Sequence, residues 1–211
     1  EYWEEQAPHK KTISNGNGKV LSYYIDGVIK ESYTFQNGLK TGPFEERTAN
    51  GVLSVSGAFD KGKKNGLWEF YSFDGKLEKR VGYQLDSLDG IYLVMSNEKD
   101  TLTFGYFEKG LKTGHWKWYN PNSVLDMDGY FVQGKQDSIW HYYFPNGQIS
   151  YIAHYQKDLR AGSWIYYYPN GALYRTGDYQ NDLRTGLWQT WYEDSTMLMS
   201  GNYQEGKEEG E

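Results

Sequence analysis

The sequence predicts an all-β fold: an elongated, single-domain, solenoid-like antiparallel β-meander of about eight 24-residue hairpin repeats in a twisted or coiled sheet. Three observations predict it. A glycine recurs every 24 residues from Gly18 to Gly210, interrupted only by Ser138, and no insertion or deletion breaks the period. Each period contains two turn signals. Aromatic residues make up 18% of the chain although its mean hydropathy is −0.82, as in strands whose rings alternate with polar residues. Such repeats stack so that each contacts chiefly its neighbours.

The chain begins with a segment outside the period. Residues 1–17 are expected to form an N-terminal capping segment, in which Tyr2, Trp3 and Ile13 cover the open edge of the first repeat. The β-hairpin repeat domain then occupies residues 18–211. Positions within each repeat are numbered from its opening glycine, which is position 0.

The first strand of each repeat is expected to carry rings at positions 2 and 5 and to end in a turn at positions 8 and 9. Position 2 is tryptophan in five of the eight repeats, and position 5 is aromatic in six. Asx-Gly pairs at positions 8 and 9 are strong hairpin signals. Pro121, Pro145 and Pro169 occupy the position before Asx in three repeats and favour a type I turn followed by a left-handed glycine. This turn would put the ring at position 5 on the face of position 11, and the tryptophan on the other face unless the strand is bulged.

The second strand carries an aliphatic residue at position 11 in most repeats, a small residue at position 15 and an aromatic residue at position 17. Because these positions differ by even numbers, we expect them to share one face, with position 15 leaving room for a ring from the neighbouring strand. A second turn, for example Asn37-Gly38, closes the repeat. Two strands of about 6 to 8 residues follow for each repeat, and no helix is expected.

The repeat that opens at Gly90 departs from this pattern. It has Asn97-Glu98-Lys99-Asp100 in place of Asx-Gly. The altered turn is consistent with a local docking spot or with neutral drift of one repeat.

Composition limits the function. The net charge of −6 opposes binding to nucleic acid, because phosphate binding usually requires a basic excess. The chain has no cysteine and no apolar run of transmembrane length. Besides His9, the histidines His115, His141 and His154 fall at different repeat positions, so we expect no repeating geometry to bring them together. We find no catalytic constellation, no metal ligands and no cofactor site in the sequence, and predict that the protein is not an enzyme.

Surplus aromatic residues between Phe104 and Tyr192 form the first candidate binding surface. They recur at positions 4 and 6 of consecutive repeats. The candidate partner-binding residues are Trp118, Tyr142, Tyr166, Phe144, Tyr168 and Tyr192. A row of rings on a β-surface is a platform for a peptide, a glycan or a hydrophobic partner. The same rings are also explained as the buried face of a coiled sheet.

Basic residues at position 22 form the second candidate surface. The residues of this candidate anionic-ligand ridge are Lys40, Lys64, Lys112, Arg160 and Arg184. Stacked repeats would line them along one edge, where they would attract anionic lipid or an acidic partner. The alternative is that they are solvated turn residues that discourage association between sheet edges.

The repeat consensus is plainest in one copy, which contains Gly162, Trp164, Tyr167, Asn170, Gly171, Leu173, Gly177 and Tyr179. With this pattern, the chain resembles the MORN-repeat variant family over about residues 18–211, a family whose bacterial members are often labelled YwqK-type antitoxins. The resemblance implies a hairpin-repeat β-sheet with a binding or scaffolding role, often on exported or lipid-anchored bacterial proteins. The classical MORN repeat is linked to phospholipid headgroups, and the acidic charge of this chain departs from a basic lipid binder.

We predict a non-enzymatic repeat scaffold that binds another protein through its extended aromatic-rich sheet surface. The alternatives are a membrane-surface or phospholipid-binding module that uses the basic ridge, a carbohydrate-binding surface and, from the family label alone, an antitoxin-like neutralising partner. The expected partner is a protein, with anionic lipid or a glycan as alternatives and no nucleic acid. Because the chain starts at Glu1 rather than methionine, we expect a removed N-terminal piece and an extracytoplasmic location in a bacterium, periplasmic or at the cell surface, with a lipid anchor before Glu1 as one option.

Overall fold

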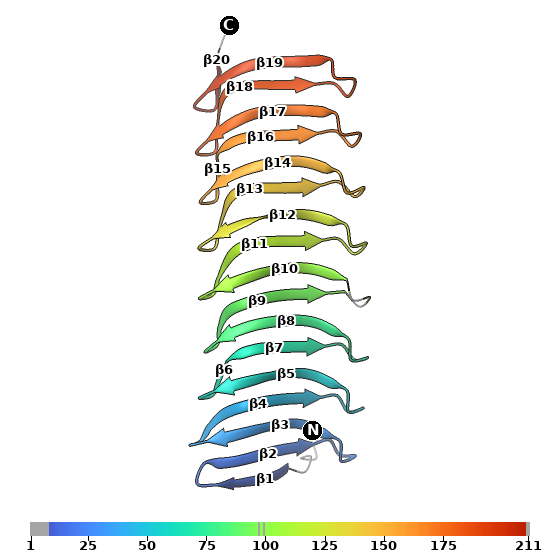
Figure 1. Ribbon diagram of the computed structural model, residues 1–211, viewed down its shortest axis with the longest axis vertical. Helices are drawn as coiled ribbons and strands as arrows, with labels where there is room; N and C mark the ends of the chain where they lie inside the picture. The colour runs from blue at the N-terminus through green and yellow to red at the C-terminus, as the bar shows by residue number, and fades with distance from the viewer. Residues whose placement is uncertain (1–8, 97, 99, 210–211) are drawn as a thin grey trace, which may run out of the picture. The chain divides into compact units, whose positions relative to one another are not determined.

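The computed structural model describes residues 9–96, 98 and 100–209, and the regular secondary structure in these ranges is entirely β-strand. The chain divides into two compact units. The first unit comprises Glu1–Thr101 and Phe107–Gly110, and the second comprises Leu102–Tyr106 and Leu111–Glu211. Within each unit, strands that follow one another in the chain pair antiparallel (Figure 1). The predicted all-β meander of hairpin repeats is confirmed.

The strands of the first unit are β1 (His9–Ser14), β2 (Asn17–Tyr23), β3 (Ile29–Gln36), β4 (Leu39–Arg47), β5 (Leu53–Asp60), β6 (Lys63–Lys64), β7 (Gly66–Tyr71), β8 (Leu77–Gln84) and β9 (Ser87–Met95). Strand β10 (Thr101–Glu108) has residues in both units. The strands of the second unit are β11 (Leu111–Tyr119), β12 (Leu125–Val132), β13 (Lys135–Tyr143), β14 (Ile149–Gln156), β15 (Leu159–Arg160), β16 (Gly162–Tyr167), β17 (Leu173–Gln180), β18 (Leu183–Trp191), β19 (Met197–Gln204) and β20 (Lys207–Glu209).

Strand β1 pairs along β2, the first strand of the first repeat, from His9 opposite Ser22 to Ser14 opposite Asn17. Tyr2 and Trp3, to which the sequence assigns a capping role, lie outside the described residues. The capping function of residues 1–17 and the start of the repeat domain at residue 18 therefore stay predictions.

The first turn of a repeat that contains proline has the geometry predicted from that residue. In one repeat, Gly171 N donates to Tyr168 O over 2.9 Å, and Tyr168 N donates to Ala172 O over 2.8 Å. Gly171 has a φ of 86°, in the left-handed region. Pro169 occupies the second residue of this type I turn, where proline is favoured. Asn170 Oδ1 accepts a hydrogen bond from Ala172 N over 2.9 Å and so braces the turn.

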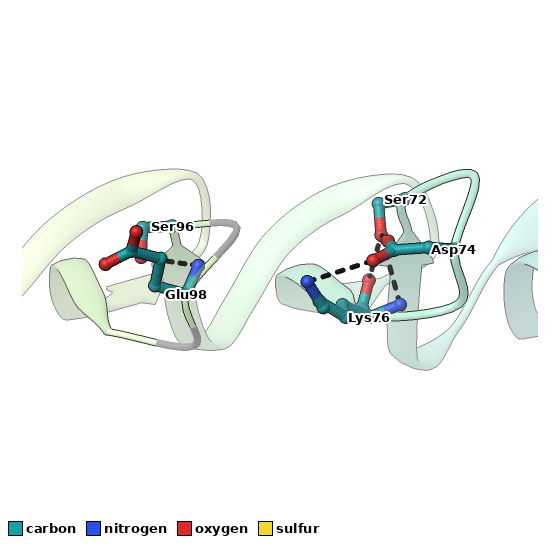
Figure 2. A network of polar contacts seen from close by, with 5 residues as sticks. All are labelled: Ser72, Asp74, Lys76, Ser96 and Glu98. Carbon is teal, nitrogen blue, oxygen red and sulfur yellow. Dashed lines mark hydrogen bonds and ion pairs between the residues drawn. The ribbon is translucent and has the colours of Figure 1, made fainter.

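The corresponding turn of the first unit is braced by side chains as well (Figure 2). Ser72 Oγ accepts from Lys76 N over 3.0 Å, and the Lys76 ammonium lies 2.9 Å from the Asp74 carboxylate. A hydrogen bond from Ser72, followed by one from Lys76, lowers the pKa of Asp74. The carboxylate therefore stays ionised in this turn at neutral pH.

The divergent repeat keeps one of the closing hydrogen bonds of this turn, and Figure 2 shows its Ser96 and Glu98. Ser96 N donates to Asp100 O over 2.7 Å, and Ser96 Oγ accepts from Glu98 N over 3.2 Å. Asn97 and Lys99 lie outside the described residues. A serine side chain thus takes over the bracing that an Asx residue supplies elsewhere.

The second turn is a two-residue hairpin in which both residues have positive φ, as a type I′ turn requires. Lys157 and Asp158, for example, have φ values of 54° and 72°. Asp158 N also donates to Gln136 O of the preceding repeat over 2.9 Å. Equivalent hydrogen bonds join successive second turns elsewhere in each unit, so that neighbouring repeats are connected at this edge.

A β-bulge decides which side chains share a face. Trp118 pairs with Met127, but the next residue, Tyr119, pairs with Leu125, which leaves Asp126 as the extra residue. Because paired residues share a face and neighbours alternate, Tyr119 and Leu125 lie on the face opposite Trp118. The ring at position 5 therefore lies with position 11, as predicted. The expectation that position 11 shares a face with positions 15 and 17 is wrong, because the bulge shifts the register by one residue.

We call the side that carries positions 2, 4, 13, 15, 17 and 22 the Trp face, and the side that carries positions 1, 3, 5, 11, 14 and 16 the opposite face. On the Trp face, each core tryptophan packs onto the small residue of the preceding repeat. A Cβ added to Gly129 would lie 2.1 Å from the ring of Trp140, which is 1% exposed. Trp140 Nε1 donates to Tyr130 O over 3.2 Å. The same close approach is made by Gly57 to Trp68, by Gly105 to Trp116 and by Gly177 to Trp188.

Where position 15 is larger, the facing ring is smaller. Val81 is fully buried and pairs with Tyr92, the residue that replaces tryptophan in the divergent repeat. The size of the residue at position 15 and the size of the ring that packs on it from the next repeat therefore compensate, which keeps the interior close-packed. The predicted role of position 15, to leave room for a neighbouring ring, is confirmed.

Candidate functional site

A second layer of rings lies on the buried tryptophans of the second unit. The ring of Trp118 stacks on Trp116 and on Trp140, with centroids 5.7 Å apart in both cases. Tyr142 continues the stack: its ring lies 6.3 Å from Trp140 and 4.1 Å from Tyr151, with 11° between the planes of the two tyrosines. Offset stacking of this kind stabilises beyond the area that it buries.

The residues of this outer row are Trp118, Tyr142, Tyr151 and Tyr166. All four side chains are half-buried, since the tryptophan floor covers them on one side only. The structure thus brings together three of the candidate residues, those at position 4. It adds Tyr151, which sequence reasoning missed because position 13 changes in type from repeat to repeat.

The candidate rings at position 6 lie apart from the outer row. Phe144, Tyr168 and Tyr192 sit at the first turns, where Tyr168 Oη donates to Trp191 O over 2.9 Å and its ring lies 5.0 Å from that of Tyr174. Tyr192 is 51% exposed. No ring contact between described residues connects these three with the outer row, so the candidate set divides into two groups.

The candidate cations at position 22 lean over rings of the Trp face. The distances from the charged group to the ring centroid are 4.3 Å for Lys40 over Tyr33, 4.5 Å for Lys64 over Trp68, 4.6 Å for Lys112 over Trp116, 4.3 Å for Arg160 over Tyr179 and 4.6 Å for Arg184 over Trp188. All five side chains are half-buried. Burial lowers the pKa of Lys112. Cation–π attraction therefore holds these charges against the sheet face in each unit.

A further cation, Arg175, joins the outer row at position 13. It pairs in register with Tyr166, and its Nε donates to Thr190 Oγ1 over 3.1 Å. Sequence reasoning missed this arginine for the same reason as Tyr151. The only signal that could have found it is its place opposite position 4 in the hairpin register.

Three arginines surround Tyr166. Burial, and then the neighbouring Tyr179, raise the pKa of Tyr166 to about 12, while the charges of Arg160, Arg175 and Arg184 oppose that rise. The Tyr166 phenol therefore remains protonated at neutral pH within a positively charged surrounding.

Among the described residues, only Arg160 of these three arginines has an acidic partner. Arg160 Nε lies 3.1 Å from Asp182 Oδ1. Neither Arg175 nor Arg184 has a carboxylate within ion-pair distance among the described residues. Two guanidinium groups beside the outer row are thus left without a counter-charge.

The opposite face of the second unit holds a buried polar cluster. Asp128 is 8% exposed, and its Oδ2 lies 2.5 Å from His115 Nε2. Its Oδ1 accepts from Tyr143 Oη over 2.8 Å and lies 3.4 Å from His141 Nδ1. The expectation that the histidines stay apart is therefore wrong for His115 and His141. They lie at positions 1 and 3 of consecutive repeats. His141 pairs with Asp128, at position 14 of the strand between them, and His115 lies opposite Tyr130 and reaches Asp128 diagonally.

This cluster does not extend to a metal site. Among the described residues, no group of three or more histidine, cysteine, aspartate or glutamate side chains is placed to hold a metal ion. In the same part of the chain, no helix is present that is long and apolar enough to cross a membrane.

Comparison with known proteins finds a repeat family that matches parts of the chain. No curated protein matches the chain in sequence. The MORN repeat variant matches at residues 64–84, 136–157 and 160–181. Each of these segments begins two residues before an opening position and spans the hairpin described above, with its tryptophan at position 2 and its ring at position 17. Three of the hairpin repeats of this chain therefore match the MORN repeat variant.

Proposed function

We propose that this chain is a non-enzymatic repeat scaffold that binds another protein through the outer row of the second unit. MORN repeats are generally modules of interaction with proteins or membranes. The observation that carries the proposal is the outer row itself, four half-buried rings that rest on buried tryptophans. Tyr142, Tyr151 and Tyr166 stack one on the next, and Trp118 joins them through Trp140. Aromatic and arginine side chains in such settings supply most of the binding energy of protein interfaces.

The opposite face of the same unit is a weaker candidate. The carboxylate of Asp128 already contacts His115, His141 and Tyr143, which leaves little of its hydrogen-bonding capacity for a ligand. Its exposed apolar residues, such as Ile139 and Leu187, occur singly along the strands, which is usual for protein surfaces.

The test compares two variants of the full chain as baits in affinity capture from the source organism, with recovered proteins quantified by mass spectrometry. The first variant combines Trp118→Ala, Tyr142→Ala and Tyr166→Ala. The matched control combines Ile139→Ala and Leu187→Ala, which are 42% and 47% exposed on the opposite face of the same unit. We expect specific proteins to be lost from the first capture and kept in the second. Equal capture by both variants, with both folded by circular dichroism, would remove the outer row from consideration.

Lipid binding through the position-22 cations is the second candidate function, favoured by their recurrence in both units. Their half-buried placement over rings reduces their reach towards a membrane surface. Anionic vesicles decide it, because attachment through these cations must weaken steeply as salt rises. Carbohydrate binding and an antitoxin-like role stay predictions, the first to be tested on a glycan array.

A further inference from the structure

We propose that the protein segment which docks on the outer row is acidic: an extended peptide whose carboxylates lie against Arg175 and Arg184 and whose apolar side chains lie on Tyr151 and Tyr166. This inference rests on the proposed function and adds the chemistry of the partner.

The distribution of charge supports an acidic partner. The whole chain carries a net charge of −6. The Trp face of the second unit, in contrast, carries four cations at positions 13 and 22, Lys112, Arg160, Arg175 and Arg184. The carboxylates beside them are Glu208, opposite Tyr203, and Asp182, which pairs with Arg160. Such a positive face on an acidic protein attracts an acidic segment to one place and repels it elsewhere, which sets both position and specificity.

Two of these cations are already oriented for binding. Arg175 is held by Thr190 Oγ1 at 3.1 Å, and Arg184 by the rings of Trp188 and Tyr203, at 4.6 Å and 5.3 Å from its Cζ. A guanidinium fixed in this way loses little conformational freedom when it binds, and its planar fork matches a carboxylate with two parallel hydrogen bonds. Both side chains are half-buried, so the attraction is less screened than on an open surface.

The first unit lacks this combination at the same repeat positions. Lys79 stands where Arg175 stands, and Glu31 and Glu46 pair with each other on the Trp face. An acidic peptide would meet two carboxylates there. Lys64 and Lys79 of the first unit therefore serve as matched controls for Arg184 and Arg175.

A single strand of nucleic acid is the competing partner, because bases also stack on rings that lie beside arginine. The acidic net charge disfavours it, since a strand of phosphates extends beyond four cations and binds through a broad basic excess. This partner class is included in the test.

The experiment measures fluorescence anisotropy of labelled peptides with the full chain. Strands β11 to β18 span about 29 Å at about 4.8 Å per strand spacing, which an extended peptide of about nine residues covers. The probe alternates glutamate with valine and tyrosine. Its two comparators replace every glutamate by glutamine or by lysine. A labelled oligothymidine of similar length is the fourth probe.

We expect the glutamate peptide to bind about tenfold or more tightly than the glutamine peptide, and the preference to disappear in about 1 M salt, where the Debye length is about 3 Å. The pair Arg175→Gln and Arg184→Gln should weaken binding of the glutamate peptide about tenfold or more. The control pair Lys64→Gln and Lys79→Gln should leave it unchanged.

Several results would overturn the inference: equal binding of the glutamate and glutamine peptides, equal loss in both variant pairs, tighter binding of oligothymidine, or no binding of any peptide. None of these outcomes affects the capture experiment, which tests the outer row without regard to charge. If the glutamine variant does not fold, Arg175→Lys with Arg184→Lys keeps both charges but not the fork, and must bind the glutamate peptide more weakly than the native chain does.

Discussion

The two units are built from the same repeat and differ in what covers their core rings. In the second unit, positions 4 and 13 carry the outer row and Arg175. In the first unit, the same positions carry Glu46 opposite Glu31 and Phe70 opposite Val55. The periodic positions therefore make the floor of the sheet in both units, and the variable positions 4 and 13 decide what kind of surface lies on it.

The largest expected difference between the units appears at alkaline pH. Burial raises the pKa of Tyr166 and of Tyr143 to about 12, and it raises the pKa of Tyr151 and Tyr155 as well. A tyrosine whose folded pKa lies above the unfolded value of about 10 stabilises fully below pH 10, and this stability is lost as pH rises through the folded pKa. We expect the free energy of unfolding to fall steeply between about pH 10 and 12. Phenolate absorbance measures the ionisation, and circular dichroism measures the loss of structure.

Two substitutions sharpen that expectation. Tyr166→Phe should reduce the alkaline loss, since it removes one ionising group, while Tyr192→Phe at an exposed first turn should not. An alkaline profile that is the same for both variants would contradict the assignment to the outer row.

A substitution at position 15, beneath a core tryptophan, should lower the free energy of unfolding by less than alkaline ionisation does and by more than any surface substitution. Gly129→Val puts side-chain atoms where the ring of Trp140 lies, and overpacking of this kind costs about 3 kcal/mol of the free energy of unfolding. Trp140→Tyr in the same chain recreates the pairing seen between Val81 and Tyr92 in the first unit. Urea denaturation of the two single variants and the double variant measures the coupling, which should recover about 1 kcal/mol or more. If the effects of Gly129→Val and Trp140→Tyr are additive, the residue at position 15 and the ring that packs on it do not compensate.

The polar clusters of the opposite face provide a smaller contrast. Glu69 in the first unit accepts from Tyr71 and Arg80, and these hydrogen bonds, that from Tyr71 first, lower its pKa. Its contribution is present above the unfolded pKa of about 4.3 and is lost as pH falls through the folded value. Asp128→Asn should lower the free energy of unfolding by about 2 kcal/mol and Glu69→Gln should lower it by about 1 kcal/mol, since the Asp128 side chain is more buried. Chemical denaturation at neutral pH checks the order, and a larger loss for Glu69→Gln would reverse it.

The smallest expected effect concerns the first turns. The second unit has proline at position 7 in three repeats, whereas the first unit has Ala49 and Phe73 there. Because the turn geometry matches proline, Ala49→Pro should stabilise by about 0.5 kcal/mol and Pro169→Ala should destabilise by about as much. Thermal melting of both variants is the measurement, and a lower melting temperature for Ala49→Pro would mean that the two turns differ in shape.

Much of the fold could be predicted from the sequence because its signals are repeated. The turn type followed from Pro145 and Pro169 with the glycine after Asx, and the ring–glycine contact followed from position 15. The face of position 11 could not be predicted correctly, because a bulge changes the side of a residue without changing the sequence period.

The candidate site was less predictable, because its contacts join residues of neighbouring repeats that have no common type. Tyr151 and Arg175 occupy a position that is glutamate, valine, lysine, threonine or methionine elsewhere. His115 and His141 meet at Asp128 only because two consecutive hairpins are paired in one register. The position-22 cations were recognised as a set, but their lean over rings depends on side-chain conformation, which spacing alone does not give.

The indole hydrogen bond from Trp140 to Tyr130 is made again by Trp68, Trp164 and Trp188 to the same place in the repeat before each of them, always ten residues earlier. Because these junctions are made in the same way, whole 24-residue modules can be duplicated or lost without the invention of a new contact, whereas removal of a few residues would misalign the junction where it falls. The number of repeats in such a protein can therefore change in whole units during evolution, each of which adds about 10 Å of paired strands. The variable positions of each new copy are free to acquire a different specificity.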